Sequence, residues 1–442
     1  MRAMKDSGIG WIGQVPESWE SRSLKYALDA HSGGAWGSNE GGDETDVICV
    51  RVADFDYAKL SVDFHDKMTV RSYTEKAIAE SSLKHGDILL EKSGGGEVTP
   101  VGRSVLFAGE EGMMCANFIE WLRPNQYFNS YFLNYWLAAA YINGFSKRNV
   151  KQTTGIQNLD IPAFLSEKIV APNVIEQKQI AQYLDIKCAE IDALIGAKEK
   201  TNALLKERRQ SIIYEAVTKG LNPDAPMKDS GIEWIGQIPE NWDLLRLRFL
   251  GAFQNGISKA GEFFGSGYPF VSYGDVYKNE VLPTVPSGLV ESTESERELY
   301  SVEKGDVFFT RTSETKEEIG IVAVCKETIP DATFAGFLIR MRPTTEVVTT
   351  DFLRYYFSCG LQREYFSKEM TLVTRASLGQ DLLKNMVVTI PSAEEQEAIV
   401  NYLDEQTQAI DSIISNNDVS IRKLKEYRQS IIYEAVTGKI EI

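Results

Sequence analysis

The sequence writes one stretch twice: Arg209-Gln-Ser-Ile-Ile-Tyr-Glu-Ala-Val-Thr218 returns unchanged as residues 428–437, 219 positions later. A long helical pattern surrounds each copy, and a mixed α/β pattern precedes each helix. Repeats are sought first, because missing one misassigns the whole fold. This repeat predicts two halves, each closed by the same long helix.

A second repeat opens each half. Residues 4–20, which we name clip 1, match residues 227–243, clip 2, at thirteen of seventeen positions. The apolar side chains of Trp11, Ile12 and Trp19 favour a structural clip that docks this segment onto a core. A direct role in ligand binding is the alternative.

Short β-rich runs follow each clip, bounded by glycine and polar clusters. In the first half, strands are predicted at 47–52, 87–90, 104–107 and 118–122, and a helix over 129–141. In the second half, strands are predicted at 268–273, 306–309, 320–324 and 336–342, and a helix from Asp351. The two α/β blocks therefore share a fold, although most of their residues differ.

Each block ends at a proline, Pro172 or Pro391, before the capping residues of a helix. Apolar residues then recur at steps close to those of a coiled-coil seam. Polar Lys198 and Asn417 interrupt the two stripes at equivalent places, where such residues fix register. The helix over 176–218 would be ~65 Å long at 1.5 Å per residue. We expect it to pack antiparallel on its copy, with the blocks at opposite ends of a rod.

These patterns predict an α+β fold. It consists of two mixed α/β domains joined by two long antiparallel coiled-coil helices, with a pseudo-twofold internal repeat. We divide the chain into domain 1 with its clip, helix 1 with a linker, domain 2 with its clip, and helix 2. The predicted bounds are 1–171, 172–222, 223–391 and 392–442.

Composition is that of a soluble globular protein: 442 residues, 43% hydrophobic and 25% charged. The N-terminus has no apolar core of a signal peptide, and no apolar run reaches ~18 residues, so we expect a cytoplasmic protein. Five scattered cysteines without a C-x-x-C pair argue against a disulfide framework or zinc ribbon. No metal site is predicted.

The formal net charge of −16 argues against a nucleic-acid binder with a basic footprint over its whole surface. A local basic face or a basic partner can still contact phosphates. The helices are nearly identical between the halves, whereas the blocks differ. Identical surfaces under a twofold bind two copies of one partner, while different surfaces recognise two different targets.

The combined motifs resemble the specificity subunit of Type I DNA restriction–modification systems, the HsdS family. The resemblance covers essentially the whole chain. It rests on the Gly-Ile-Glu-Trp-Ile-Gly-Gln-Ile-Pro-Glu-Asn-Trp opening, the Lys-Gly-Asp-Val and His-Gly-Asp-Ile turns, the Glu-Gln pairs at 176–177 and 395–396, and the repeated helix ends.

The resemblance implies two target recognition domains, each reading one half of a split asymmetric DNA site. It implies that the helices act as a spacer and dock two adenine-methyltransferase subunits, which restriction subunits join. It also implies a chain without catalysis of its own, with S-adenosylmethionine, ATP and Mg²⁺ on partner subunits. The alternative is a two-headed protein-binding adaptor with no DNA role.

Candidate DNA contacts are cations, hydroxyls and amides on predicted loops, because these groups reach phosphates and base edges. In the first half they are Lys92, Ser93, Gly94, Lys147, Arg148, Asn149, Lys151 and Gln152; in the second they are Arg311, Thr312, Ser313 and Arg375. Ordinary solvated loops are the alternative. Candidate partner-docking residues are Arg209, Tyr214, Glu215, Arg428, Tyr433 and Glu434, and a buried seam position is the alternative for the two tyrosines.

Two short patterns are typical of enzymes. Residues 263–267 match the F-x-G-x-G motif of methyltransferases, but no amine-holding Asn/Asp-Pro-Pro-Phe/Tyr motif occurs in the sequence. Residues 314–316 follow Asp306 like part of a nuclease D…E-x-K site, at a short spacing. We interpret both as loops and predict no catalytic residue.

Overall fold

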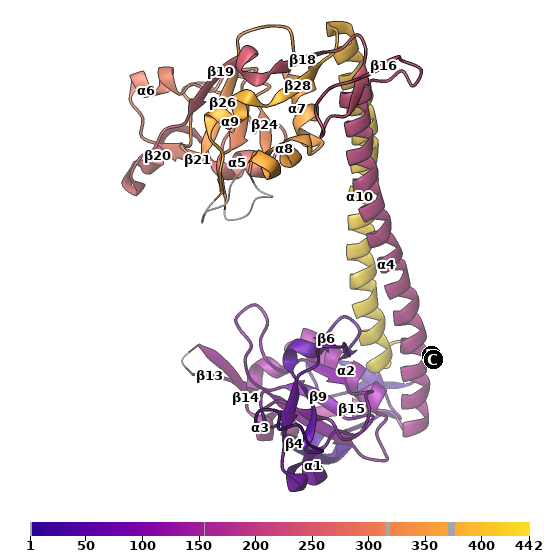
Figure 1. The fold of residues 1–442 in the computed structure, drawn as a ribbon. Helices are drawn as coiled ribbons and strands as arrows, with labels where there is room; N and C mark the ends of the chain where they lie inside the picture. The colour runs from indigo at the N-terminus through magenta and orange to yellow at the C-terminus, as the bar shows by residue number, and fades with distance from the viewer. Residues whose placement is uncertain (1, 154, 314–318, 370–375) are drawn as a thin grey trace. The chain divides into compact units, whose positions relative to one another are not determined.

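The structure is a computed structural model that describes residues 2–153, 155–313, 319–369 and 376–442. The chain divides into two compact units. Unit 1 comprises Met1–Lys198 and Val419–Ile442, and unit 2 comprises Glu199–Asp418. Each unit therefore contains one clip, one α/β block and a part of both long helices, α4 (Val174–Lys219) and α10 (Ala393–Val436) (Figure 1). The four-part division of the sequence stays a prediction.

The block of unit 1 is built on a six-stranded sheet. Its order is β4 (Leu28–Gly33), β12 (Ile119–Pro124), β9 (Ile88–Glu91), β10 (Ser104–Leu106), β7 (Ser61–Val62) and β6 (Phe55–Asp56). Strand β9 is buried along its whole length, because it pairs antiparallel with β12 on one side and β10 on the other. Helix α2 (Ser130–Ile142) is capped by the Asn129 side chain, and its buried Phe132 and Trp136 belong to the core of this unit.

A smaller sheet and two further pairs of strands complete the block of unit 1. The smaller sheet has the order β11 (Met114–Cys115), β5 (Asp46–Val50) and β8 (Val70–Ser72). The pairs are β13 (Val150–Thr153) with β14 (Ile156–Leu159), and β15 (Lys168–Ala171) with β3 (Glu20–Ser23). The short helices are α1 (Glu75–Ser81), η3 (Ser146–Asn149) and α3 (Ile161–Ser166).

Unit 2 repeats this plan. Its main sheet has the order β19 (Gly251–Asn255), β26 (Leu338–Pro343), β22 (Val307–Thr310) and β24 (Val322–Val324); its smaller sheet has the order β21 (Gly288–Val290), β20 (Phe264–Val271) and β25 (Thr333–Phe334). The remaining pairs are β18 (Asp243–Arg246) with β28 (Val387–Ile390) and β23 (Thr312–Ser313) with β27 (Ala376–Ser377). The helices of this block are α5 (Tyr273–Tyr277), α6 (Glu294–Leu299), α7 (Thr350–Ser358), α8 (Leu361–Glu369) and α9 (Gln380–Asn385). The predicted repetition of the strand order is confirmed.

Both clips dock onto a core, as predicted. Clip 1 pairs β1 (Met4–Asp6) with β2 (Gln14–Pro16), and clip 2 pairs β16 (Met227–Asp229) with β17 (Gln237–Pro239). Trp19 and its counterpart Trp242 are fully buried. A glycine at the end of a long helix lies against each tryptophan: Gly438 against Trp19 and Gly220 against Trp242. Both glycines have positive φ, and a Cβ there would also crowd the tryptophan ring.

The two long helices are antiparallel, as predicted. In unit 2, Asn202 of α4 donates to Asp418 of α10 at 2.9 Å, and Arg209, further along α4, pairs with the earlier residue Asp411 at 3.2 Å. Asn417 donates to Asn202 at 2.9 Å, so the polar residue that interrupts the stripe is bonded across the seam. Buried polar pairs of this kind specify register.

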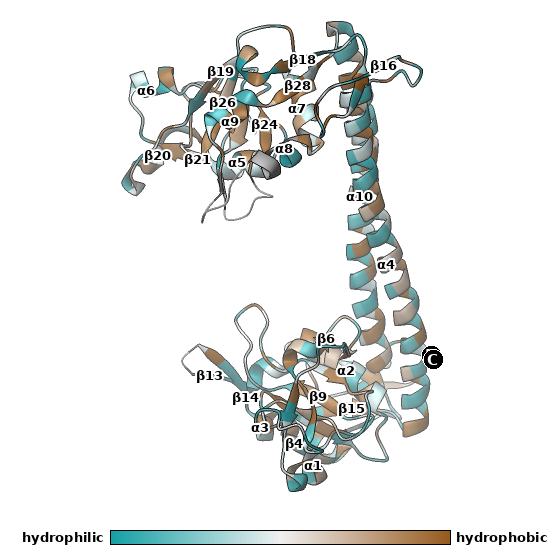
Figure 2. Cartoon of the chain, viewed as in Figure 1, coloured by the Kyte–Doolittle hydropathy of each residue, from teal (hydrophilic) through white to brown (hydrophobic). Residues whose placement is uncertain are grey.

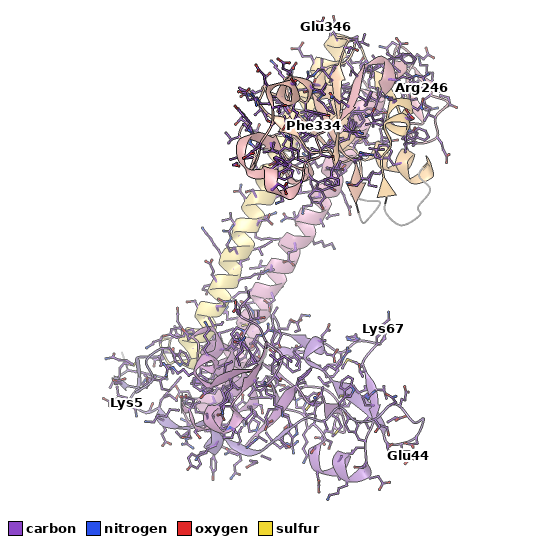
Figure 3. All side chains as sticks on the ribbon, turned by 90° about the vertical axis from the view of Figure 1, so that its left-hand side faces the viewer. Lys5, Glu44, Lys67, Arg246, Phe334 and Glu346 are labelled. Atoms are coloured by element: carbon purple, nitrogen blue, oxygen red, sulfur yellow. The ribbon has the colours of Figure 1, made fainter. Side chains whose placement is uncertain are left out.

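Hydropathy follows the layers of the fold. In Figure 2 the strands of both sheets carry mostly hydrophobic residues, whereas α4 and α10 are striped with hydrophilic and hydrophobic ones. Buried Phe334 lies inside its block in Figure 3, while the exposed Arg246 and Glu346 lie at its surface. Among the described residues, no helix is long and apolar enough to span a bilayer.

Candidate nucleic-acid interface

Two predicted DNA-contact stretches of unit 1 meet in space. The Ser93 hydroxyl donates to Asn158 Oδ1 at 2.6 Å, and the Gly94 N–H donates to the carbonyl of Gln157 at 3.1 Å. The Leu159 N–H donates to the carbonyl of Lys92 at 2.8 Å. The stretch after β9 is therefore bonded to β14 of the β13–β14 hairpin. We name residues 92–94 together with this hairpin loop pair 1.

The register of the hairpin exposes its polar face. Strand β13 pairs with β14 so that Lys151 lies opposite Asn158 and Gln152 opposite Gln157. Along β14, exposed and buried residues alternate, as expected for a strand with one face on the core. Buried Gln157 accepts the N–H of Val101 at 3.3 Å and so holds the hairpin to the block. Lys151 and Gln152 remain exposed.

Unit 2 builds the same contact at equivalent positions. Thr312 of β23 pairs with Ser377 of β27, just as Ser93 forms a bridge with Asn158 in unit 1. The Leu378 N–H donates to the carbonyl of Arg311 at 2.7 Å. We name residues 311–313 together with β27 loop pair 2. Arg375 and the pattern at 314–316 lie outside the described residues.

Lys92 is not a free cation. Its ammonium lies 3.0 Å from Glu120 Oε2, and His31 Nδ1 lies 2.8 Å from the other oxygen of the same carboxylate. Glu120 is buried, and a buried carboxylate must be paired. Lys92 therefore holds loop pair 1 to the sheet, and its charge is already neutralised.

The cations of the second stretch are more available. Lys147 and Arg148 are exposed and form no ion pair among the described residues. Lys151 lies 2.5 Å from Asp160, and this hydrogen bond lowers the pKa of the Asp160 carboxyl. The pair is solvent-exposed and therefore weak, so Lys151 can exchange it for a phosphate. The Asn149 amide donates to Glu167 at 3.2 Å.

The Gly-Asp turns before the two loop pairs are structural staples. Asp87 accepts the N–H of Lys84 at 2.8 Å and two hydrogen bonds from Arg123, at 2.8 and 2.7 Å. Asp306 accepts the N–H of Glu303 and two bonds from Arg342 in the same way. These hydrogen bonds raise the pKa of both arginines. The aspartates are buried and hold the turns that start β9 and β22.

The F-x-G-x-G pattern lies in an irregular part of β20. Phe264 and Tyr268 both pair with Val290, so residues 265–267 bulge from the strand. Gly265 and Gly267 have φ of +98° and +95°, which other residues rarely adopt. The motif therefore lies in a bulged part of a strand, and helix α5 begins only at Tyr273.

The predicted docking residues are mostly engaged within their own units. Arg428 pairs with Asp192 at 3.0 Å in unit 1, and Arg209 with Asp411 and Glu280 in unit 2. The Tyr433 hydroxyl donates to the carbonyl of Trp11 at 3.1 Å, and Glu434 accepts from Ser430 at 2.8 Å. Tyr214 is half-buried and Glu215 is exposed. Their docking role stays a prediction.

Sequence reasoning missed the task of the glutamine that starts each long helix. Gln177 accepts the N–H of Asn129 at 2.8 Å and donates to the carbonyls of Tyr127 and Pro172, at 3.1 and 2.8 Å. Gln396 makes the same three bonds, to Thr349, Val347 and Pro391. Each glutamine thus joins a long helix to the start of the block helix, α2 or α7. Its recurrence five residues after the proline was the available signal.

A family model described as the Type I restriction modification DNA specificity domain matches residues 239–419. The Type I restriction enzyme MjaVIII specificity subunit of Methanocaldococcus jannaschii is 25% identical over 399 residues, covering 87% of this chain and 86% of that relative. The EcoKI specificity subunit of Escherichia coli strain K12 is 25% identical over 331 residues, covering 72% and 67%.

Solved structures share the fold. One, from work described as the structural basis underlying complex assembly and conformational transition of the type I R-M system, matches with a TM-score of 0.72 at 16% identity, over 96% of this chain and 99% of that one. The HsdS subunit from Thermoanaerobacter tengcongensis matches with a TM-score of 0.54 at 16% identity, over 96% and 98%. The predicted fold class is confirmed.

Proposed function

Because the chain belongs to the family of Type I restriction–modification specificity subunits, whose role in the complex is non-catalytic, we propose that it reads a split asymmetric DNA site. Each unit reads one half of that site. The chain docks two adenine-methyltransferase subunits and, through them, restriction subunits.

The observation that carries the proposal is the equivalence of the two loop pairs. Both follow a buried strand that starts at a Gly-Asp staple, and both are closed by the same bridge, at Ser93 in one and Thr312 in the other. The frameworks match, while the exposed side chains differ. This is the arrangement expected of two readers, because backbone contacts fix position and base contacts specify sequence.

The exposed groups divide by chemistry. Lys147, Arg148 and Lys151 suit phosphates, and the amide of Gln152 suits adenine N6 and N7. Asn149 must break its hydrogen bond to Glu167 before it can contact DNA. Lys92 contributes by holding loop pair 1 to the sheet. In unit 2 the proposed readers are Arg311, Thr312, Ser313 and Arg375.

The chemistry is proposed to lie on the partners. Methyl transfer, cleavage and DNA translocation need S-adenosylmethionine, Mg²⁺ and ATP, which we assign to the methyltransferase and restriction subunits. The helix ends around Glu215 and Glu434 recur in both units, so they offer two equivalent docking positions. Partners that bring phosphate contacts of their own also offset the net charge of −16.

The test is genome-wide adenine methylation in cells that express the methyltransferase partner with and without this chain. We expect a split asymmetric motif that vanishes when the chain is deleted. Exchange of residues 24–170 for those of a relative with another specificity should change one half of the motif and leave the other. An unchanged methylome with active partners would reject the reader function.

The acidic charge favours one competing function, a two-headed adaptor for proteins. Salt separates the two, because each neutralised phosphate adds about −0.9 to the slope of log affinity against log salt. A complex whose DNA affinity does not respond to salt would favour the adaptor.

A further inference from the structure

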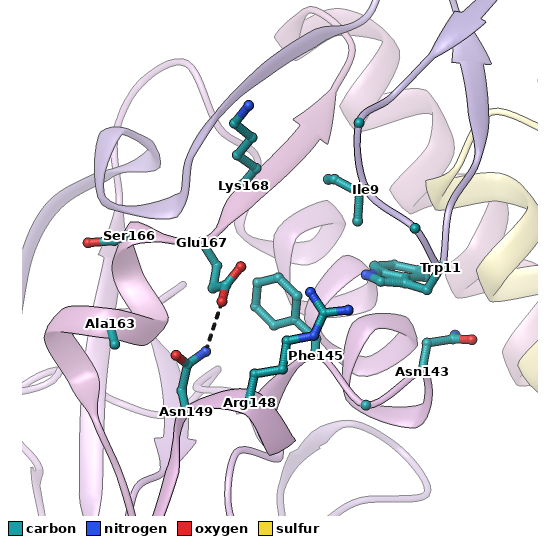
Figure 4. Close-up of a pocket in the computed structure, with 13 residues that line it drawn as sticks. Ile9, Trp11, Asn143, Phe145, Arg148, Asn149, Ala163, Ser166, Glu167 and Lys168 are labelled. Atoms are coloured by element: carbon teal, nitrogen blue, oxygen red, sulfur yellow. Dashed lines mark hydrogen bonds between the residues drawn. The ribbon is translucent and has the colours of Figure 1, made fainter.

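A cavity of ≈ 510 Å³ lies in unit 1 between clip 1 and the block. Its walls come from residues 8–11 of clip 1, residues 143–149 around η3, and residues 163–168 of α3 and β15 (Figure 4). Loop pair 1 does not line it. The cavity is therefore separate from the proposed base-reading surface, although one of its lining residues, Arg148, lies two positions before the start of the β13–β14 hairpin.

The charged lining of the cavity is predominantly basic. Arg148 and Lys168 are exposed, and neither forms an ion pair within the described ranges. The only acid among the lining residues is Glu167, and it accepts a hydrogen bond from the Asn149 amide at 3.2 Å. The cavity thus carries two uncompensated cations against one carboxylate, which favours an anionic ligand.

A third donor lies beside Arg148, whereas the Lys168 side chain extends away from both in Figure 4. The indole N–H of Trp11 is buried and has no acceptor among the residues that the structure describes. In Figure 4 the nitrogen edge of this ring faces Arg148, and the ring of Phe145 lies behind them. Neither a guanidinium nor an indole N–H can accept, so the two cannot satisfy each other. An oxyanion accepts hydrogen bonds from both.

Unit 2 shows that the fold does not require this charge. Lys168 opens β15 opposite Ser23, and the residue that opens β28 opposite Arg246 is Val387. Glu233 occupies the clip 2 position that Gly10 occupies in clip 1. Trp234, the counterpart of Trp11, also buries an indole N–H that has no acceptor among the described residues. The difference between the units therefore lies in the charged lining, because Lys168 is not repeated at the equivalent position of unit 2.

We propose that this cavity binds a phosphate group, held by Arg148 and Lys168 with the Trp11 indole N–H as a further donor. The phosphate has two possible sources with the same chemistry: the DNA backbone beside the half-site read by unit 1, or a free nucleotide. The DNA source rests on the proposed function, whereas the phosphate site does not. Bound to the backbone, the cavity would anchor one half of the site more firmly than the other.

The experiment follows the indole N–H signal of Trp11 by NMR in the full chain, assigned by its loss in Trp11→Phe. Inorganic phosphate and thymidine 5′-monophosphate are titrated at constant ionic strength, with chloride as the reference anion. We expect a saturable shift with both phosphates and none with chloride. Arg148→Ala and Lys168→Ala should each weaken the binding at least tenfold, which is about 1.4 kcal/mol.

Lys67→Ala is the matched control, because Lys67 is an exposed cation of unit 1 that does not line the cavity and has no proposed DNA contact. It should leave phosphate binding unchanged, and Glu167→Gln should strengthen it. A shift that never saturates, or an equal loss in Lys67→Ala and Lys168→Ala, would overturn the proposal. If Arg148→Ala does not fold, Lys168→Ala and Glu167→Gln decide.

A DNA arm separates the two sources. If a duplex that carries the methylated motif displaces phosphate from the wild-type chain, the natural source of the phosphate group is the DNA backbone. If only the nucleotide displaces phosphate, the natural ligand is a free nucleotide. Either result supports the site. Phosphate binding together with a methylome that deletion of the chain leaves unchanged would reject the reader function and keep the phosphate site. A methylation motif that vanishes on deletion, without any phosphate binding, would keep the reader function and reject the phosphate site.

Discussion

Units 1 and 2 attach an α/β block to the long helices through equivalent residues, but with different electrostatics. In unit 1, the Tyr135 hydroxyl donates to Asp185 of α4 at 2.8 Å. In unit 2, Tyr355 donates to Asp404 of α10 at 2.6 Å, and Arg354 adds an ion pair to the same carboxylate, also at 2.6 Å. One framework thus tolerates a carboxylate bonded only to a tyrosine hydroxyl in one unit and a carboxylate that also pairs with an arginine in the other.

The comparison shows which parts of the repeat are constrained. The buried staples, the glutamine joints and the clip tryptophans recur because each satisfies polar groups or fills space that the fold creates. The exposed side chains of the loop pairs and the exposed cations of the Trp11 cavity differ, because solvent can satisfy these groups in either case. Four sets of substitutions test this division, in order of decreasing effect.

The largest loss is expected from the staples. Asp87→Ala and Asp306→Ala each remove a buried carboxylate that accepts two hydrogen bonds from a partly buried arginine and one from a turn N–H, which costs about 3–5 kcal/mol. Hydrogen exchange of β9 and β22 peptides measures each unit separately. We expect similar losses in the two units. A loss confined to one unit would break the equivalence of the staples.

The glutamine joints come next. Gln177→Ala and Gln396→Ala each leave two carbonyls and one N–H short of a buried partner, at about 1–3 kcal/mol. Chemical denaturation of the full chain measures the loss in the free energy of unfolding. Hydrogen exchange at the start of α2 or α7 shows where in the structure the protection is lost. The expected exchange is local to the mutated unit. Wild-type protection in both variants would contradict the joint.

A smaller effect on stability is expected at the contacts that attach each α/β block to a long helix. Burial raises the pKa of Asp185 against the opposing hydrogen bond from Tyr135. Burial also acts to raise the pKa of Asp404, but hydrogen bonds from Tyr355 and Arg354 outweigh it and lower that pKa. Ionised Asp185 therefore costs stability at neutral pH. Ionised Asp404 contributes stability above its unfolded pKa, and this is lost as the pH falls through the folded pKa.

Asp404→Asn should accordingly destabilise unit 2 by about 1 kcal/mol at pH 7, whereas Asp185→Asn should leave unit 1 unchanged or slightly more stable. The difference between the variants should shrink as the pH falls below the ordinary carboxyl range. Thermal unfolding at pH 7 and pH 4 measures it. Equal destabilisation by both substitutions at pH 7 would remove the electrostatic contrast.

The smallest change in stability is expected in loop pair 1. Lys151→Ala removes an exposed ion pair and should shift stability by about 0–0.5 kcal/mol. It should also lower the salt slope of DNA binding by the assembled complex by about 0.9. Lys76→Ala, which removes another exposed cation of unit 1, is the control. Equal slopes for both variants would place Lys151 outside the DNA contact.

Much of the fold was predictable because it is repeated or periodic. The first long helix is predicted over 176–218 and extends over Val174–Lys219, because capping residues and an apolar stripe mark such boundaries locally. The strands after Gly86 and Gly305 were found because β-rich runs between turn residues are local signals as well. The role of Gln177 was missed, since a lone glutamine carries no pattern until its three partners come together.

The candidate site was predictable only in parts. Cations and amides on loops marked residues 92–94 and 147–152 separately, but nothing in the sequence joined them. Lys92 illustrates the limit, because its charge is neutralised by Glu120, a residue 28 positions away on a neighbouring strand. Sequence shows which charges exist, and long-range pairing decides which of them remain free.

By itself, the sequence determined that the protein has two equivalent halves, where the long helices begin and end, and that the two blocks differ. These features follow from repetition and from local spacing, which one chain carries in full. The tertiary structure alone decided that the two loops of each unit form one surface, that the Gly-Asp turns are staples and that clip 1 encloses a basic cavity. Such features depend on contacts between residues far apart in the chain, because only folding brings their donors, acceptors and charges within reach of one another.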